Sequence, residues 1–142
     1  MKWAFLIFLL GLDIVSKIFA TQWLGIEIFR LSGITFSLDY VTNTGAAWGL
    51  FTGHSGLLFI LRTAIILGLL WFVPKKFPIW LIVTGAVGNA IDYCLYGHVV
   101  DFLHFTFWNY SFPIFNVADS CITIGVLCLF LSQRSLKQPQ SL

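Results

Sequence analysis

Four apolar stretches, each close to the length of a membrane-crossing helix, make up most of this chain. They cover residues 3–23, 56–73, 77–96 and 117–131. A helix needs about 20 mostly apolar residues to cross the hydrocarbon core of a bilayer. Only 10% of the residues are charged, against about 25% in soluble domains. We therefore expect an all-α membrane protein, a four-transmembrane-helix bundle that forms one membrane-embedded domain over residues 1–142.

The first stretch has a second interpretation, because a short apolar run behind Lys2 is also typical of a secretory signal peptide. No small-x-small cleavage site follows this run, whereas three further apolar stretches do. These two observations favour a first membrane span over a cleaved signal peptide.

Lysine and arginine residues in the loops predict the orientation of the bundle, since short cytoplasmic loops are enriched in them. One side carries Lys2, the PKK turn at 74–76, and a tail with Arg134 and Lys137. The loops on the other side, residues 24–55 and 97–116, carry Arg30 alone. We therefore expect both termini in the cytoplasm and the two long loops outside.

The first long loop contains a segment of alternating polarity. In this segment Ile34, Phe36, Leu38 and Tyr40 alternate with Thr35, Ser37, Asp39 and Val41. A period of two is typical of a half-buried strand, so we expect a small extracytoplasmic β element on the membrane surface. The following TNTGAAWG segment is rich in small and turn-forming residues, which would allow the backbone to approach a ligand closely.

Two of the predicted spans contain polar or ionisable side chains, which are costly in a bilayer and usually face the bundle interior. Asp13 and Lys17 are four residues apart on one helix face, and we interpret them as an ion pair that anchors the first helix. Asn89 and Asp92 share a face near the outer end of the third span. They either form a hydrogen-bonded pair within a helix contact or line a polar site.

Two aspartates lie at the outer ends of neighbouring spans. Asp101 follows the third span within a few residues, and Asp119 lies in the first turn of the fourth. A carboxylate in a first helical turn complements the helix dipole, which accounts for Asp119 but not for Asp101. Two carboxylates in a poorly solvated site share one proton, and such a pair can hydrolyse a peptide bond. The ionised member takes a proton from water while the protonated member polarises the carbonyl.

Other chemistries have less support in the sequence. The cysteines form no CxxC motif and the scattered His54, His98 and His104 form no HExxH pair, so we expect neither a metal site nor a cofactor. No Ser/His/Asp set is apparent, and the histidines are interpreted as structural or interfacial. A net charge of +2 without a basic stripe argues against a nucleic-acid partner.

Five motifs follow one another along the chain: LDIVSK, NTGAAWG, GAVGNAID, GHVVDF and FNVADS. Together they resemble the lipoprotein signal peptidases, the type II signal peptidases of bacteria, over residues 12–132. The resemblance implies an aspartyl endopeptidase of the bacterial cytoplasmic (inner) membrane, with its active site on the outer face. Such an enzyme removes signal peptides from prolipoproteins by cleaving before a diacylglyceryl-modified cysteine. It further implies contacts with membrane lipids and inhibition by globomycin-type cyclic peptides.

The resemblance also implies roles for individual residues. It makes Asp101 and Asp119 the catalytic dyad. The matching supporting positions are Asp13, Lys17, Asn43, Gly45, Asn89, Asp92, Asn116 and Ala118. The third motif commonly continues with arginine, where this chain has Tyr93. Because Arg62 is expected at a similar depth to Asp92, we hypothesise that it balances this carboxylate; alternatively, it reaches to lipid phosphates.

Two other functions remain open on the sequence. A small proton-coupled carrier or channel subunit could use Asp13, Asp92 and Asp119 as a relay. Such a relay should distribute its carboxylates across the bilayer, whereas three of those in this chain are expected at one border. The second alternative is an assembly subunit that binds lipidated proteins without cleaving them.

Overall fold

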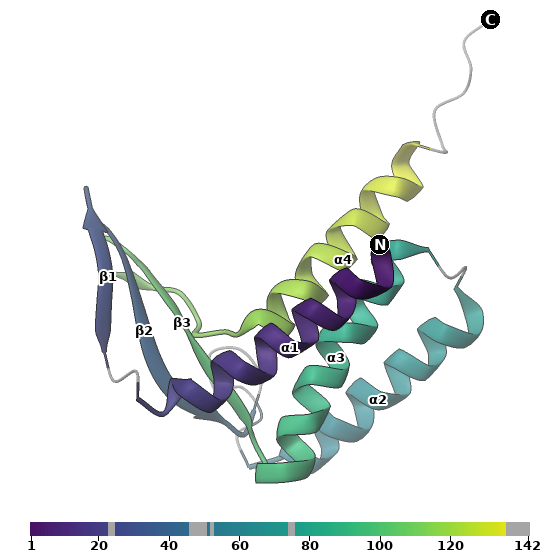
Figure 1. Cartoon of the computed structure of the whole chain (residues 1–142), viewed down its shortest axis with the longest axis horizontal. Coiled ribbons are helices and arrows are strands. Elements are labelled where there is room, and N and C mark those ends of the chain that lie inside the picture. The colour runs from purple at the N-terminus through teal and green to yellow at the C-terminus, as the bar shows by residue number, and fades with distance from the viewer. Residues whose placement is uncertain (23–24, 46–50, 52, 74–75, 136–142) are drawn as a thin grey trace, which may run out of the picture.

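The computed structural model describes residues 1–22, 25–45, 51, 53–73 and 76–135, and within them it has four helices and one sheet (Figure 1). The helices are α1 (Lys2–Ala20), α2 (Ser55–Phe72), α3 (Phe77–Tyr96) and α4 (Val117–Ser135). The strands are β1 (Ile26–Leu31), β2 (Ile34–Asn43), β3 (Val99–Phe107) and β4 (Tyr110–Ser111). Each of the four predicted apolar stretches is helical, with helix ends within a few residues of those expected.

The sheet is larger than the sequence analysis predicted, and it makes the fold a combination of helices and sheet rather than all-α. The predicted strand lies inside β2. The second long loop, for which no strand was predicted, contains β3 and β4, and β1 precedes β2. The strands form one antiparallel sheet in the order β1-β2-β3-β4. The second loop thus completes the sheet that the first loop begins.

Local sequence explains how β1 and β2 are joined. Leu31 pairs with Ile34 across a two-residue turn. The turn residues Ser32 and Gly33 have φ of 46° and 86°. A two-residue hairpin turn matches the twist of its strands when both central residues have positive φ. Glycine adopts positive φ without strain.

The register between β2 and β3 places one of the predicted catalytic residues. Val41 pairs with Asp101, and Asn43 pairs with Val99. The register shifts between Leu38 and Val41, and such a bulge redirects side chains locally. The end of β2 and the beginning of β3 therefore bring Asn43 and Asp101 to the part of the sheet that meets the helices.

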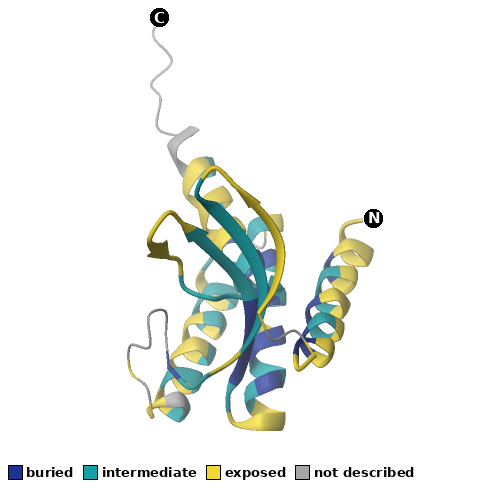
Figure 2. Ribbon diagram, turned by 90° about the vertical axis from the view of Figure 1, so that its left-hand side faces the viewer, coloured by how far each residue is buried: buried dark blue, intermediate teal, exposed yellow. Residues whose placement is uncertain are grey.

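Helix α3 lies at the centre of the helical part and packs against the other three helices. Small residues allow the close approach. A Cβ atom at Gly88 would lie 2.6 Å from Asp13 Oδ2 of α1, and one at Gly125 of α4 would lie 2.7 Å from the Pro78 carbonyl oxygen. Figure 2 shows the buried residues concentrated on α3, on the adjoining part of β3 and on one side of α1.

The outward faces of the helices are apolar and exposed. Exposed side chains include Ile7 at 71% and Trp71 at 83%. In the described residues, α1 and α3 are long and apolar enough to cross a membrane, and shorter apolar helices cover Gly56–Phe72 and Val117–Ser132. Apolar side chains that pack against nothing within the chain are expected where lipid covers them.

The two ends of the helical bundle differ in character. The first residues of α1 and α3 lie together, with Trp3 and Trp80 rings 4.9 Å apart. This end is remote from the sheet, and the beginning of α1 and the end of α4 lie at it (Figure 1). The predicted polar residues lie at the opposite end, where the sheet meets α1, α3 and α4.

Candidate active site

Asp101 is held by two amide groups in the buried part of β3. Asn43 Nδ2 donates to its Oδ2 at 2.8 Å, and Asn116 Nδ2 donates to its Oδ1 at 2.7 Å. The residue is only 2% exposed. Burial, together with the nearby charge of Asp119, raises the pKa of Asp101 to about 7, although the two amide hydrogen bonds oppose this shift. Asp101 therefore exchanges a proton near neutral pH.

Asp119 lies in the first turn of α4, and Asn116 caps this helix. Asn116 Oδ1 accepts a hydrogen bond of 2.8 Å from the Asp119 backbone N–H, as an N-cap side chain does. Asp119 Oδ1 also accepts a hydrogen bond of 2.8 Å from Asn89 Nδ2 of α3. The cap and the amide of Asn89 together fix the position of the Asp119 carboxyl group.

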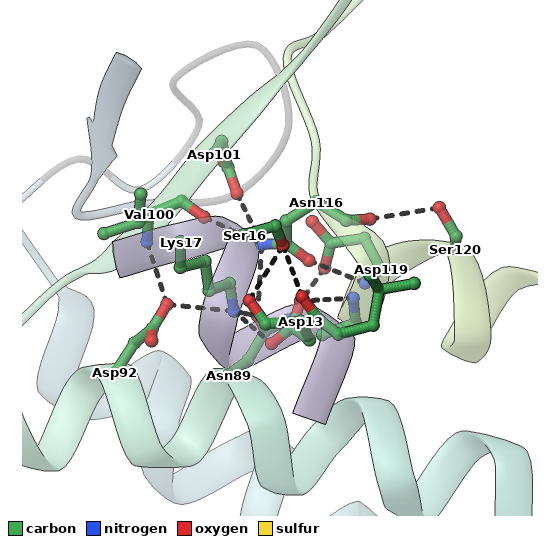
Figure 3. Close-up of polar contacts among 12 residues, drawn as sticks. Asp13, Ser16, Lys17, Asn89, Asp92, Val100, Asp101, Asn116, Asp119 and Ser120 are labelled. Atoms are coloured by element: carbon green, nitrogen blue, oxygen red, sulfur yellow. Dashed lines mark hydrogen bonds and ion pairs between the residues drawn. The ribbon is translucent and has the colours of Figure 1, made fainter. Parts of the chain in front are cut away.

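Asn116 connects the two aspartates. Its side chain donates to Asp101 and accepts from the backbone of Asp119, and it is fully buried. The same Nδ2 lies 3.2 Å from both Asn89 Oδ1 and the Val100 carbonyl oxygen. Figure 3 shows Asp101 above this amide and Asp119 beside it, from β3 and α4 respectively. The structure thus brings together the two carboxyl groups that the sequence placed at one border.

A buried lysine lies beneath this pair. Lys17 Nζ is 2.8 Å from Asp13 Oδ2, 2.9 Å from Asp92 Oδ2 and 3.0 Å from Asn89 Oδ1. The first two contacts are ion pairs, and the third is a hydrogen bond donated by Lys17. The predicted Asp13–Lys17 ion pair is confirmed, and it extends to Asp92.

The partner that the sequence analysis gave to Asp92 is wrong. Asp92 pairs with Lys17 and accepts a hydrogen bond of 3.0 Å from the Val100 backbone N–H. Arg62 instead donates to the Gly45 carbonyl oxygen at 3.3 Å. Of the two alternatives for Asn89 and Asp92, the hydrogen-bonded pair does not form, because the Asn89 amide contacts Asp119 and Lys17. Arg62 of α2 lines a cavity to which Asp92 of α3 does not contribute, and helix depth alone could not predict this difference.

The second carboxylate oxygen of Asp13 connects α4 to this centre. Asp13 Oδ1 accepts a hydrogen bond of 2.7 Å from the Ala118 backbone N–H, at the free amino end of α4. Ala118 is 1% exposed and faces Gly88, where a Cβ atom would lie 3.3 Å from its methyl group. Asp13 therefore holds α4 against α1 and sets the position of the turn that carries Asp119.

The segment after β2 reaches the same centre. Asn43 Oδ1 accepts a hydrogen bond of 2.9 Å from the Gly45 N–H, which leaves its Nδ2 facing Asp101. Arg62 of α2 holds the Gly45 carbonyl from the other side. The rest of the NTGAAWG motif, residues 46–49, lies outside the described residues. The turn at Asn43–Gly45 links Arg62 to Asp101 through three successive hydrogen bonds.

A cavity of about 320 Å³ opens beside the pair of aspartates, between α2 and α3. Its walls are mainly aliphatic, and its polar lining residues include Asn43, Arg62, Asn89 and Asp119. An apolar cavity with a few convergent polar groups is typical of a ligand site. Here the cavity is suited to an apolar substrate segment whose reacting bond lies next to Asp119.

All ten residues singled out from the sequence gather in this one region, at the end of the helices next to the sheet. The sequence analysis missed the contact of Arg62 with Gly45. It also missed a second polar group on the sheet, formed by Asp39, His104 and Ser111. Among the described residues, no group of three or more His, Cys, Asp or Glu side chains is arranged to hold a metal ion.

Residues 5–134 match the family model for signal peptidase (SPase) II. The chain belongs to the signal peptidase II family. The lipoprotein signal peptidase of Bacillus subtilis (strain 168) is 34% identical to it over 89% of this chain and 91% of that protein. The lipoprotein signal peptidase of Gloeothece citriformis (strain PCC 7424) is 37% identical over 92% of this chain and 88% of that protein.

Solved structures give the same relationship. Two structures of a bacterial membrane enzyme resemble this chain with TM-scores of 0.78 and 0.77, at 31% and 32% identity. The first match covers 99% of this chain and 93% of that one. The resemblance predicted from the motifs is therefore confirmed. As a member of the signal peptidase II family, the chain is a membrane-embedded protease, which decides against a carrier or a non-cleaving assembly subunit.

Proposed function

We propose that Asp101 and Asp119 are the catalytic dyad with which this signal peptidase II cleaves prolipoproteins before the diacylglyceryl-modified cysteine. The observation that carries this proposal is the bridge through Asn116, which holds one carboxyl group on β3 and the other on α4. Burial and the mutual repulsion of the two charges favour a state in which the pair shares one proton. That state is the one needed for acid–base hydrolysis of a peptide bond.

In the proposed mechanism, the ionised carboxylate takes a proton from a water molecule as it attacks the scissile carbonyl. The protonated carboxyl group donates to the carbonyl oxygen, and a proton then passes to the leaving amine. The pair titrates as a unit, so the two roles belong to the dyad and not to one fixed residue.

The supporting residues act through the dyad. Asn43, Asn89 and Asn116 orient its oxygens by hydrogen bonds, and Gly45 orients Asn43. Lys17 offsets the charges of Asp13 and Asp92, which in turn hold the backbone at Ala118 and Val100. Each of these residues fixes a different element against the dyad.

We further infer that all four helices span the bacterial inner membrane, with both termini in the cytoplasm and the dyad at the outer face. The exposed apolar helix surfaces support spanning, and the lysine and arginine distribution supports this orientation. Single cysteines at Ser37 and Gln138 in a cysteine-free chain should react with an impermeant reagent from opposite sides. Reaction from the same side would overturn the topology.

The lipid on the substrate serves as a membrane anchor in this proposal. Each buried CH₂ contributes about 0.8 kcal/mol to membrane anchoring, so two acyl chains hold the cysteine at the depth of the dyad. The apolar cavity beside Asp119 offers space for the signal peptide, and for globomycin-type cyclic peptides as competitors. Equal cleavage of lipidated and unlipidated precursors would contradict the anchoring role.

The dyad is tested with Asp101→Asn and Asp119→Asn, incubated with a diacylglyceryl prolipoprotein and assayed by gel mobility and amino-terminal sequencing. Each variant should lose cleavage by at least about 10²-fold, because asparagine keeps the shape but not the proton chemistry. The matched control is Glu27→Gln, which removes a carboxylate on the exposed strand β1. Near-normal turnover by either aspartate variant, with deamidation excluded, would refute the mechanism.

A further inference from the structure

A second group of catalytic-type side chains lies on the sheet, apart from the dyad. His104 Nδ1 lies 2.8 Å from Asp39 Oδ2, and His104 Nε2 lies 2.8 Å from Ser111 Oγ. The three residues come from β2, β3 and β4, so the sheet itself brings them into line. In this arrangement one ring nitrogen of a histidine contacts a serine hydroxyl and the other contacts an aspartate. Such an arrangement activates a serine nucleophile.

The hydrogen bonds define the tautomer of His104. A carboxylate only accepts hydrogen bonds, so Asp39 takes the proton-bearing Nδ1–H, and the Nε2 lone pair faces the Ser111 hydroxyl. Ser37 Oγ donates to the same Asp39 oxygen at 3.1 Å and helps to hold it in place. His104 is therefore oriented as a base toward Ser111.

The position of Ser111 on the sheet leaves it accessible. Its side chain is exposed, whereas those of His104 and Asp39 are 21% and 23% exposed. Phe112 N–H donates to the Phe105 carbonyl oxygen, and Ser111 is opposite Thr106. Because successive N–H groups of a strand point in opposite directions, the Ser111 N–H is directed away from β3. A nucleophile's own N–H, when it points away from the neighbouring strand, can stabilise the oxyanion formed when its hydroxyl attacks.

An open groove of about 530 Å³ borders His104 and Asp39 of this group on the polar face of the sheet, and Ser111 lies outside its lining. Its lining includes Glu27, Thr35 and Ser37 as well as Asp39 and His104. Neither Asp101 nor Asp119 lines it, and the cavity beside the dyad contains none of the three residues of this group. The two sites are separate in space.

The geometry points to Ser111 as the nucleophile of a second hydrolytic site, which takes acyl esters at the surface of the protein. The Ser111 hydroxyl proton passes to His104 Nε2 as Oγ bonds to the ester carbonyl carbon. The tetrahedral intermediate then expels the alcohol, which leaves with the proton from Nε2. Water, deprotonated by the same nitrogen, attacks the acyl–Ser111 ester. The carboxylic acid is released as Ser111 Oγ takes the proton back from Nε2.

The test uses a fluorophosphonate probe on the full-length protein in detergent. An activated serine displaces fluoride and forms a stable Oγ–P bond, so the modified residue is found by peptide mass spectrometry. Ser111 should be labelled in the wild-type protein, and Ser111→Ala should remove this label. His104→Gln should slow labelling by at least about tenfold, because it removes the base. His98→Gln, at a histidine outside the group, is the matched control.

Two further variants connect the result to the geometry. Asp39→Asn should slow labelling, since asparagine no longer fixes the tautomer. Asp101→Asn should be labelled at the wild-type rate, which makes this result independent of the proposed dyad. Thermal unfolding of each variant shows whether it is folded. Absence of label on Ser111, or equal labelling of His104→Gln and wild type, would overturn the second site and leave the group as a hydrogen-bonded link between strands.

Discussion

Replacing Lys17 with methionine tests the electrostatic centre of the fold. Methionine keeps an unbranched side chain of similar length but removes the charge that lies 2.8 Å from Asp13 and 2.9 Å from Asp92. The lysine side chain is 3% exposed, so water cannot replace the lost cation. Removing one partner of a buried ion pair costs about 3–5 kcal/mol, and Lys17 serves two carboxylates.

That loss is comparable with the whole stability of many proteins, which is about 5–15 kcal/mol. We therefore expect Lys17→Met to lower the free energy of unfolding in detergent by at least about 3 kcal/mol. Lys76→Met is the matched control, because Lys76 is exposed at the start of α3. The measurement is reversible unfolding followed by circular dichroism.

The partner of Lys17 is identified by a double-mutant cycle. Asp92→Asn in the Lys17→Met background removes one of the carboxylates left without a cation, so it should restore part of the lost stability. The coupling energy should exceed about 0.5 kcal/mol, whereas Arg62→Gln combined with Asp92→Asn should be additive within that error. Additivity for Lys17 and Asp92, or a loss in Lys17→Met no larger than in Lys76→Met, would refute the assignment.

Three further predictions concern the dyad and its surroundings. The rate of cleavage should decline as pH rises through about 7, because Asp101, with its pKa raised to about 7, then loses the proton that the pair shares. Initial rates measured across this pH range test the decline. Arg62→Gln should lower kcat by about tenfold with little change in thermal stability, since it removes a charge-assisted hydrogen bond to Gly45 that positions Asn43. Gly88→Ala should destabilise the protein by about 1–3 kcal/mol, since its Cβ would lie 2.6 Å from Asp13 Oδ2. The control Gly11→Ala has open space around its Cβ and should not destabilise the protein. Thermal unfolding compares the two variants.

The helices could be predicted because their signal lies in local composition. Each apolar run is bounded by polar or turn-forming residues, and the structure begins and ends the helices near those borders. The strand β3 could also have been found. In β3, Leu103, Phe105 and Phe107 alternate with His104 and Thr106, which is the same period of two that predicted β2. The apolar beginning of β3 obscured this alternation.

The Ser111–His104–Asp39 group had no sequence signal of its own. Its members come from three strands, and only the register of the sheet brings them together. His104 pairs with Ser37, two residues before Asp39, while Ser111 pairs with Thr106, two residues after His104. Such diagonal neighbours across strands lie within reach of long side chains. Predicting this group would have required the pairing of β3 with both β2 and β4.

The wrong partner predicted for Asp92 shows that helix geometry determines the depth of a side chain but not its direction around the helix. A rise of about 1.5 Å per residue places Arg62 and Asp92 at similar depths, but depth does not say which way a side chain points around its helix. Asp92 pairs with Lys17 of α1 and accepts a hydrogen bond from the Val100 N–H of β3. Arg62 and Tyr93 both line the cavity beside Asp119. Arg62 therefore places its charge at the cavity next to Asp119, and not at Asp92.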